Sequence, residues 1–245
     1  MNQLARIVRI FLPSRTRGFL RATHREYVFG RAMKQFLKDP GACAHPGNPI
    51  IIDLIYGWGN EGWSALDEYI AGCIAKAMDT DGPTLECGSG LSTILLGAIA
   101  HQRGQKYWAL EHTPVWAARV QKYLDKYKLD SVVLDAKPLK DFGAYCWYDA
   151  PLETMPDSFS LIICDGPPGD TKGGRYGIVP VMRARLKPGC VILLDDAGRD
   201  EEFAIGKRWE SELGTSFEFL GAEKPYIQLT VTGEKKPVEE CTSPN

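Results

Sequence analysis

The segment Thr-Leu-Glu-Cys-Gly-Ser-Gly-Leu-Ser-Thr-Ile-Leu-Leu, residues 84–96, constrains the fold of this 245-residue chain more than any other. It is typical of a buried strand that passes through a glycine turn into a helix. Gly88 and Gly90 can adopt positive φ and lack a Cβ, so a ligand can approach the backbone closely while the N–H groups of the helix point toward it. The segment therefore predicts a nucleotide cradle, with the acid Glu86 just before the glycines.

A second acid indicates the class of ligand. Glu111 ends the next apolar run and lies twenty-one residues beyond Gly90, which is where a βαβ nucleotide site places its ribose-hydroxyl ligand. A dinucleotide site would also need a third glycine where this chain has Thr93. In addition, the Glu86 carboxylate would repel a pyrophosphate and attract an ammonium group. These residues favour a nucleoside that carries a positively charged end.

The rest of the chain alternates strand and helix patterns, which implies an α/β fold with a mainly parallel sheet. The further strand candidates are 131–135, 161–165, 190–195, 217–220 and 227–231. The last two suggest a final antiparallel pair. We expect a Rossmann-like, doubly wound, seven-stranded sheet, mostly parallel, with ligands at the carboxyl ends of its parallel strands.

Three acids follow the fourth and fifth of these strands. Asp165 precedes Gly-Pro-Pro-Gly, and Asp195 and Asp196 follow the run Cys-Val-Ile-Leu-Leu. Neighbouring strand ends can bring the three together, and clustered carboxylates repel one another unless they are protonated or neutralised by a hard cation. A divalent metal such as Mg²⁺ is the simplest solution. The alternative is that Asp196 caps the next helix or pairs with Arg199, while Asp165 touches only the cofactor.

Four motifs in this order resemble those of class I S-adenosylmethionine-dependent methyltransferases. They are Leu-Glu-Cys-Gly-Ser-Gly, Ala-Leu-Glu-His, Leu-Ile-Ile-Cys-Asp-Gly-Pro-Pro and Leu-Lys-Pro-Gly-Cys-Val-Ile-Leu-Leu-Asp-Asp. The likeness covers roughly residues 64–232. Within the class, the chain is most similar to the catechol-type O-methyltransferases and the methyltransferase family 24 group. Their metal ligands include an aspartate after strand four and an acidic–amide pair after strand five, where this chain has Asp196 in the position that commonly carries Asn.

The resemblance implies S-adenosylmethionine as the cofactor. It implies the cofactor-binding residues Glu86, Gly88, Ser89, Gly90, Ser92, Glu111, His112, Asp135, Ala136 and Asp165. Asp135 can equally cap the turn after its strand. The catalytic residues and metal ligands would be Asp165, Asp195 and Asp196, with Mg²⁺ acidifying an acceptor hydroxyl that then attacks the sulfonium methyl group.

Candidate substrate residues are Trp63, Arg175 and Arg199, although isolated arginines are more often salt-bridged structural residues. Trp147 and Tyr148 either floor the pocket or fill the core. Gly166 separates Asp165 from Pro167 and Pro168, whereas amino-group methyltransferases often have Asn or Asp directly before Pro-Pro and an aromatic residue. This departure favours O-methylation of a small-molecule or carbohydrate hydroxyl.

Two other classes of protein stay open. An NAD-linked oxidoreductase could use Glu111 for its ribose, and a catalytically silent nucleoside-binding module could keep the cradle without turnover. The mildly acidic bulk of the chain gives no continuous groove for nucleic acid. The seven cysteines lack Cys-x-x-Cys spacing, and the four histidines are scattered, so a structural zinc site has little support.

The net charge of −2 hides an asymmetry, because residues 1–38 carry +8 and the remaining chain −10. This basic end predicts peripheral contact with a membrane or polyanion, or a helix docked on the domain or on a second subunit of a homo-oligomer.

Residues 1–63 are expected to combine this segment with an aromatic and glycine-rich loop that can act as a lid. Residues 64–232 would form the cofactor-binding domain, whose first helix begins at Ser64, and 233–245 a flexible tail. No run approaches the ~20 apolar residues of a membrane span, and no signal-peptide pattern is present, so we expect a cytoplasmic protein.

Overall fold

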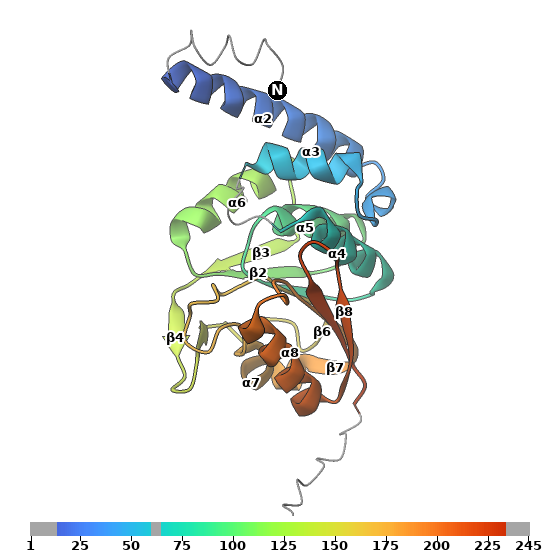
Figure 1. Cartoon of the computed structure of the whole chain (residues 1–245), viewed down its shortest axis with the longest axis vertical. Coiled ribbons are helices and arrows are strands. Elements are labelled where there is room, and N and C mark those ends of the chain that lie inside the picture. Colours follow the sequence, from blue (N-terminus) through green and yellow to red (C-terminus); the bar gives the residue numbers. More distant parts are fainter. Residues whose placement is uncertain (1–13, 60–64, 234–245) are drawn as a thin grey trace, which may run out of the picture.

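The computed structural model describes residues 14–59 and 65–233. Within them, the expected seven-stranded sheet is confirmed, with the strand order β3-β2-β1-β6-β7-β9-β8 (Figure 1). Its strands are β1 (Thr84–Cys87), β2 (Tyr107–Glu111), β3 (Val132–Ala136), β6 (Phe159–Cys164), β7 (Leu186–Leu194), β8 (Thr215–Leu220) and β9 (Tyr226–Val231). The pairs from β3 to β7 are parallel, and β9 runs antiparallel to both β7 and β8.

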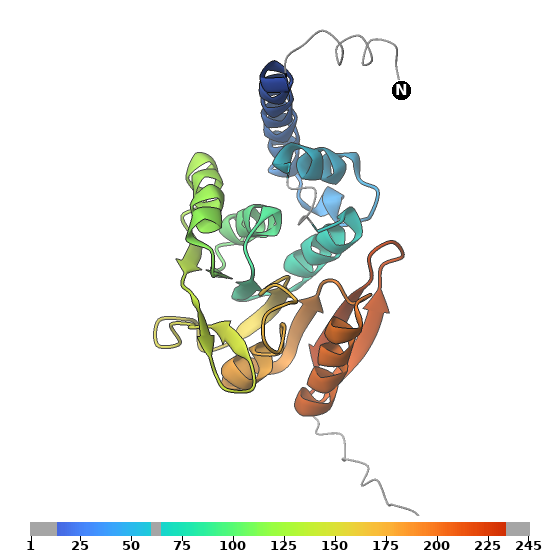
Figure 2. The ribbon, with the colours of Figure 1, turned by 60° about the vertical axis from the view of Figure 1, so that its left-hand side comes forward.

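Helices cover both faces of this sheet (Figures 1 and 2). They are α2 (Ser14–Phe36), α3 (Pro49–Trp58), α4 (Asp67–Asp79), α5 (Leu91–Gln102), α6 (Pro114–Tyr127), α7 (Ile178–Met182) and α8 (Asp200–Leu213), with the short 3₁₀ turns η1 (Gly41–Cys43) and η2 (Arg183–Arg185). The side chains of β6 alternate between the faces: Leu161 and Ile163 join the hydrophobic cluster beneath α4 and α5, and Ile162 and Cys164 join the cluster beneath α7 and α8. This alternation is the period of two that a strand buried on both faces requires.

The register of the central strands aligns their carboxyl ends. Cys87, the last residue of β1, pairs with Leu110 of β2 and with Cys164 of β6. Cys164 in turn pairs with Leu194, the last residue of β7. The residues that follow these positions therefore emerge side by side at one edge of the sheet, where doubly wound folds bind their ligands.

The segment before the sheet contains a helix that the sequence prediction missed. Residues 39–63 were expected to form a loop, but Pro49–Trp58 is α3. Asn48 caps the helix by accepting a hydrogen bond from the Ile50 N–H at 2.9 Å, Pro49 occupies the first turn, and Gly59 ends the helix at φ 71°. These are ordinary start and stop signals, and the glycine and aromatic content of the segment obscured them.

The first domain helix also begins later than expected. Helix α4 starts at Asp67 with Leu66 as its N-cap, and Ser64 lies outside the described residues. The Asp67 carboxylate accepts a hydrogen bond from the Gly47 N–H at 2.7 Å. Phe29 of α2 and Trp58 of α3 lie in the same hydrophobic cluster as α4 and α5. The boundary at residue 64 stays a prediction, as does the tail at 233–245, which apart from Gly233 lies outside the described residues.

A small second sheet pairs β4 (Leu139–Asp141) with β5 (Cys146–Tyr148) in antiparallel fashion. The sequence prediction did not include it. Across the described ranges, 14–59 and 65–233, no helix is both long and apolar enough to cross a membrane. The cytoplasmic location stays a prediction.

Candidate functional site

The turn between β1 and α5 requires glycine at one of its two predicted positions. Gly88 has φ +86°, and a Cβ added there would lie 3.0 Å from the Gly166 backbone nitrogen and 3.1 Å from the Asp165 carbonyl carbon. The tips of β1 and β6 can thus approach only if residue 88 has no side chain. Gly90 differs from the expectation, because its φ of −178° is extended backbone. A Cβ at Gly90 would meet nothing within 4 Å, so its backbone faces open space.

Glu86 lies behind this turn and holds it together. The residue is fully buried, and its carboxylate accepts hydrogen bonds from Ser92 Oγ at 2.5 Å, Thr93 Oγ1 at 2.6 Å and Tyr107 OH at 2.9 Å. Burial raises the pKa of Glu86 to about 7, although these three hydrogen bonds act in the opposite direction. Neither Glu86 nor Ser92 is among the residues that line the cavity described below, and their contact with the cofactor stays a prediction.

Thr93, in the place of a dinucleotide site's third glycine, connects two parts of the turn. Its Oγ1 accepts a hydrogen bond from the Gly90 N–H at 2.8 Å and donates one to Glu86. The side chain is fully buried. Thr93 thus fills the position with a hydroxyl that ties the first turn of α5 to β1, rather than leaving it clear for close helix packing.

Glu111 occupies the tip of β2 beside the turn. Its Oε2 accepts hydrogen bonds from the Ser89 N–H at 3.1 Å and the Ser89 hydroxyl at 2.8 Å. Its Oε1 accepts two more, each 2.8 Å long, from the N–H groups of His112 and Thr113. The acid is therefore fixed in orientation against the turn, as a ligand for ribose hydroxyls must be.

A cavity of about 720 Å³ lies over these strand tips. It is lined by Leu66, Gly88, Ser89, Glu111, His112, Thr113, Trp116, Tyr148, Asp165, Gly166, Pro168, Gly169, Arg175, Asp196, Arg199 and Lys224. Its volume is in the range of cofactor and small-molecule sites. The sequence-predicted residues that line it are Gly88, Ser89, Glu111, His112, Asp165, Arg175, Asp196 and Arg199. The cavity connects the predicted ribose position with the acids at the neighbouring tips.

The remaining predicted residues do not line this cavity. Asp135 and Ala136 lie at the carboxyl end of β3, where Ala136 pairs in register with Glu111, but Asp135 is 3.6 Å from Lys137 Nζ in an ion pair. Asp195 is fully buried below the cavity floor. Trp63 lies outside the described residues.

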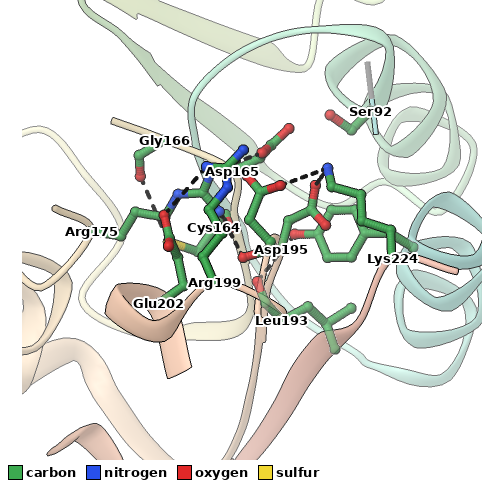
Figure 3. A network of polar contacts seen from close by, with 12 residues as sticks. Ser92, Cys164, Asp165, Gly166, Arg175, Leu193, Asp195, Arg199, Glu202 and Lys224 are labelled. Carbon is green, nitrogen blue, oxygen red and sulfur yellow. Dashed lines mark hydrogen bonds and ion pairs between the residues drawn. The ribbon is translucent and has the colours of Figure 1, made fainter. Parts of the chain in front are cut away.

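The three acids after β6 and β7 converge as predicted. One carboxylate oxygen from each of Asp165, Asp195 and Asp196 lies within 4.8 Å of the other two (Figure 3). Asp196 has a positive φ of 61°, a conformation that Asp and Asn adopt more readily than other residues with a side chain. The backbone at position 196 therefore favours Asp or Asn over other residues with a side chain.

Two cationic side chains lie among these carboxylates. Arg175 Nη2 is 2.6 Å from Asp196 Oδ2 and 3.2 Å from Asp165 Oδ1. Lys224 Nζ is 2.7 Å from Asp195 Oδ2 and 2.9 Å from Asp196 Oδ1. Burial raises the pKa of Asp165, the Asp195 carboxylate raises it further, and Arg175 opposes both. For Asp196, burial acts upward, but Arg175 and Lys224 hold the pKa below its ordinary value.

Arg175 was predicted to contact the substrate, but most of its hydrogen bonds are internal. The side chain is only 3% exposed, and its Nη1 donates to the backbone carbonyl of Asp195 at 2.8 Å. It therefore fastens the tips of β6 and β7 together. Arg199 is different: it is 54% exposed, lines the cavity, and pairs with Asp196 at 3.2 Å and with Glu202 at 3.6 Å. The expected Arg199–Asp196 pair is present, whereas no side-chain cap binds the first turn of α8.

Lys224 is the residue that the sequence prediction missed. It lies in the loop between β8 and β9, and the register pairs Ile227 of β9 with Leu194 of β7. Because β9 runs antiparallel to β7, the loop before β9 lies beside the residues that follow β7. Only the position of β9 next to β7 could have indicated this contact. That position is a property of the folded sheet. Tyr148 also lines the cavity, whereas Trp147 is fully buried in the core.

The donor set does not fit a divalent metal in the way the sequence suggested. Metal binding was inferred from three carboxylates that lacked a neutralising partner. In the folded protein, Arg175 and Lys224 supply that charge, and both oxygens of Asp196 already accept hydrogen bonds or ion pairs from them. No step of the chemistry below is routed through a metal.

The comparisons with known proteins agree with this fold. Residues 85–197 match a family model described as a methyltransferase domain. No curated protein matches the chain in sequence. A precorrin-6y C5,15-methyltransferase from Geobacter metallireducens GS-15 is similar in structure, with a TM-score of 0.53, 18% identity, and coverage of 69% of this chain and 90% of that one.

Two further solved structures are similar over more of the chain. A methyltransferase from Podospora anserina bound to S-adenosylhomocysteine has a TM-score of 0.52 and 16% identity, covering 91% of this chain and 98% of that one. An O-methyltransferase from Bacillus cereus in complex with S-adenosylhomocysteine has a TM-score of 0.51 and 14% identity, covering 93% and 96%. Residues 85–197 thus match a methyltransferase domain, and the chain shares the fold of methyltransferases, two of which were solved with S-adenosylhomocysteine bound.

Proposed function

We propose that this methyltransferase transfers a methyl group from S-adenosylmethionine to a hydroxyl oxygen of a small molecule or a carbohydrate. The observation that carries the proposal is the single cavity that extends from Glu111, at the predicted ribose position, to Asp165 and Asp196 at the neighbouring strand tips. Such a cavity can hold a methyl donor next to an acceptor hydroxyl, with a carboxylate within reach to accept the hydroxyl proton.

The residues around the glycine turn would hold the cofactor. Glu111 would accept hydrogen bonds from the ribose hydroxyls, and Gly88 and Ser89 would approach it with their backbone. His112 and Trp116 lie on the same wall and would border the nucleoside. When bound, S-adenosylmethionine supplies an electrophilic methyl group on a sulfonium and leaves as the neutral thioether after the carbon–sulfur bond breaks.

Asp165 is the proposed proton acceptor. Its side chain is 26% exposed and lines the cavity, and its Oδ1 interacts with Arg175. Among the described residues, its Oδ2 has no hydrogen-bond partner. The acceptor hydroxyl would give its proton to Asp165 as its oxygen forms the bond to the methyl carbon, and the carboxyl group would then release that proton to water. Asp195 and Asp196 would act by holding Arg175 and Lys224 in place.

The two alternative functions are weakened to different degrees. Glu86 no longer argues against a pyrophosphate, because its carboxylate is buried away from the cavity. Thr93, in the place of a third glycine, still disfavours a dinucleotide, and the methyltransferase-domain match favours the methyl donor. A catalytically silent module would bind the cofactor without turnover, which only an acceptor screen distinguishes.

Calorimetric titration of the purified protein with S-adenosylhomocysteine, S-adenosylmethionine and NADH tests the proposal. We expect binding of the first two, and at least tenfold weaker binding by Glu111→Ala, because it removes the ribose ligand. Glu111→Gln keeps one acceptor oxygen, and its affinity should lie between those of wild type and Glu111→Ala. Tighter binding of NADH, or equal cofactor affinity of Glu111→Ala and wild type, would contradict it. A screen of phenolic and sugar hydroxyl acceptors with labelled methyl donor then tests turnover.

A further inference from the structure

The ammonium group of Lys224 lies where two neighbouring carboxylates would share a metal ion. Its Nζ is 2.7 Å from Asp195 Oδ2 and 2.9 Å from Asp196 Oδ1 (Figure 3). A divalent ion at this position would bind the same two oxygens, at about 2.0 to 2.6 Å. The ammonium and the ion therefore compete for one position.

Arg175 occupies a second position at which a metal ion could bind these acids. Its guanidinium contacts Asp196 Oδ2 and Asp165 Oδ1, and the backbone carbonyl of Asp195 holds it at 2.8 Å. The side chain is only 3% exposed, so these contacts are largely shielded from water. A guanidinium also keeps its charge at every physiological pH, so the cation at this position is permanent.

Three cationic side chains already lie beside the three carboxylates of the cluster. Three carboxylates face Arg175, Lys224 and Arg199, whose Nη1 is 3.2 Å from Asp196 Oδ2. A divalent ion placed among them would lie next to three positive groups, and this repulsion is strong where water is largely excluded. We infer that Lys224 and Arg175 take the place of a metal in this site and that the methyltransferase works without a divalent cation.

Lys224 can also supply what the metal would supply to the acceptor. An ammonium group has three N–H donors, and Asp195 and Asp196 accept two of them. The residue lines the cavity with its side chain 27% exposed. The third N–H can therefore donate to the acceptor oxygen and stabilise the negative charge that develops there. Only this last role rests on the proposed O-methylation.

Mn²⁺ binding to the full-length protein tests the inference, measured by electron paramagnetic resonance of free Mn²⁺ and by calorimetry without any acceptor. We expect wild type to bind no Mn²⁺ at this cluster. Lys224→Met removes the charge but keeps most of the side-chain volume, so this variant should bind Mn²⁺ with one-to-one stoichiometry. Lys224→Arg keeps a cation at this position and should therefore bind no Mn²⁺, as wild type does. Lys122→Met, on an exposed position of α6, is the matched control and should behave as wild type.

Two outcomes overturn the inference. If wild type binds Mn²⁺ with one-to-one stoichiometry and Asp195→Asn abolishes this binding, a metal does occupy the cluster. If neither wild type nor Lys224→Met binds Mn²⁺ while both retain their thermal unfolding transition, the carboxylates form no cation position for Lys224 to fill. Because neither measurement uses the methyl acceptor, failure here is distinguishable from failure of the proposed O-methylation.

Discussion

Glu86 shows how one side chain can serve the site without lining the cavity. Its carboxyl group is buried and receives hydrogen bonds from Ser92, Thr93 and Tyr107. Two of these donors lie in the first turn of α5, and the third lies in β2. The acid thus ties the helix and two strands to the turn that faces the cavity. Its effect on cofactor binding should be indirect, through the shape of that turn.

The raised pKa of Glu86 predicts a dependence of stability on pH. Burial raises its pKa to about 7 from the ordinary glutamate value of 4.5, so the folded state binds more protons than the unfolded state between these two pH values. The stabilising contribution is complete below the unfolded pKa and is lost as pH rises through the folded pKa. Wild type should therefore lose about 2 kcal/mol relative to Glu86→Gln between about pH 5 and about pH 7.5.

Urea unfolding of both proteins at the two pH values measures this difference. Other titrating groups contribute equally to wild type and variant, so their effects cancel in the comparison. Loss of a hydrogen bond in Glu86→Gln shifts the variant by the same amount at both pH values. A stability difference between the two proteins that stays constant with pH would show that Glu86 titrates normally.

At the scale of elements, the turn between β1 and α5 depends on the close approach of two strand tips. A Cβ added to Gly88 would lie 3.0 to 3.1 Å from backbone atoms of Asp165 and Gly166, whereas a Cβ added to Gly90 would meet nothing within 4 Å. Gly88 also has a positive φ of 86°, and Gly90 is extended. The packing of the strand tips therefore requires glycine at position 88 but places no such requirement on position 90.

This difference predicts unequal effects of the same substitution. Gly88→Ala should lower the free energy of unfolding by at least about 2 kcal/mol, because a Cβ both strains the backbone and pushes β1 away from β6. Gly90→Ala, the matched control, should change stability by less than about 1 kcal/mol. Thermal and urea unfolding of both variants provide the measurement. Equal destabilisation by the two substitutions would refute the assigned roles.

At the scale of the whole molecule, the charge asymmetry has a structural counterpart. Helix α2 lies at one end of the molecule, on the side away from α7 and α8 (Figure 1). It carries Phe19, Leu20 and Tyr27 with 70%, 50% and 68% of their surface exposed. Large apolar side chains beside a basic sequence are typical of helices that bind anionic membrane surfaces.

We predict that the full chain sediments with vesicles that contain anionic phospholipid, more than with neutral vesicles, and that added salt weakens this binding. The double variant Phe19→Ser/Leu20→Ser should reduce it at least threefold, while cofactor binding stays unchanged because neither residue lines the cavity. Absence of vesicle binding, together with a dimer in solution that this variant dissociates, would instead make the exposed face an interface between two copies.

Much of the site could be predicted because its residues follow strand ends. Gly88, Glu111, Asp165 and Asp196 each come directly after or at the end of an apolar run, and parallel strands bring such positions to one edge. The face of the sheet toward which a side chain points could not be predicted in this way. Glu86 precedes the end of its strand, and the alternation of β1 turns it toward Tyr107 and the first turn of α5. A shift of one residue along a strand reverses the face.

The sequence by itself determined which residues lie at the strand tips. The hydrophobic period of each strand, the glycine turn and the acids after the strands depend on neighbours within a few positions, so local patterns are enough to predict them. The tertiary structure alone decided which charges meet there. Lys224 reaches Asp195 from 29 positions away, and Arg175 reaches Asp196 from 21. Such pairs form only when strand order and register bring distant loops together, and electrostatic interaction depends on that separation in space, which no local pattern contains.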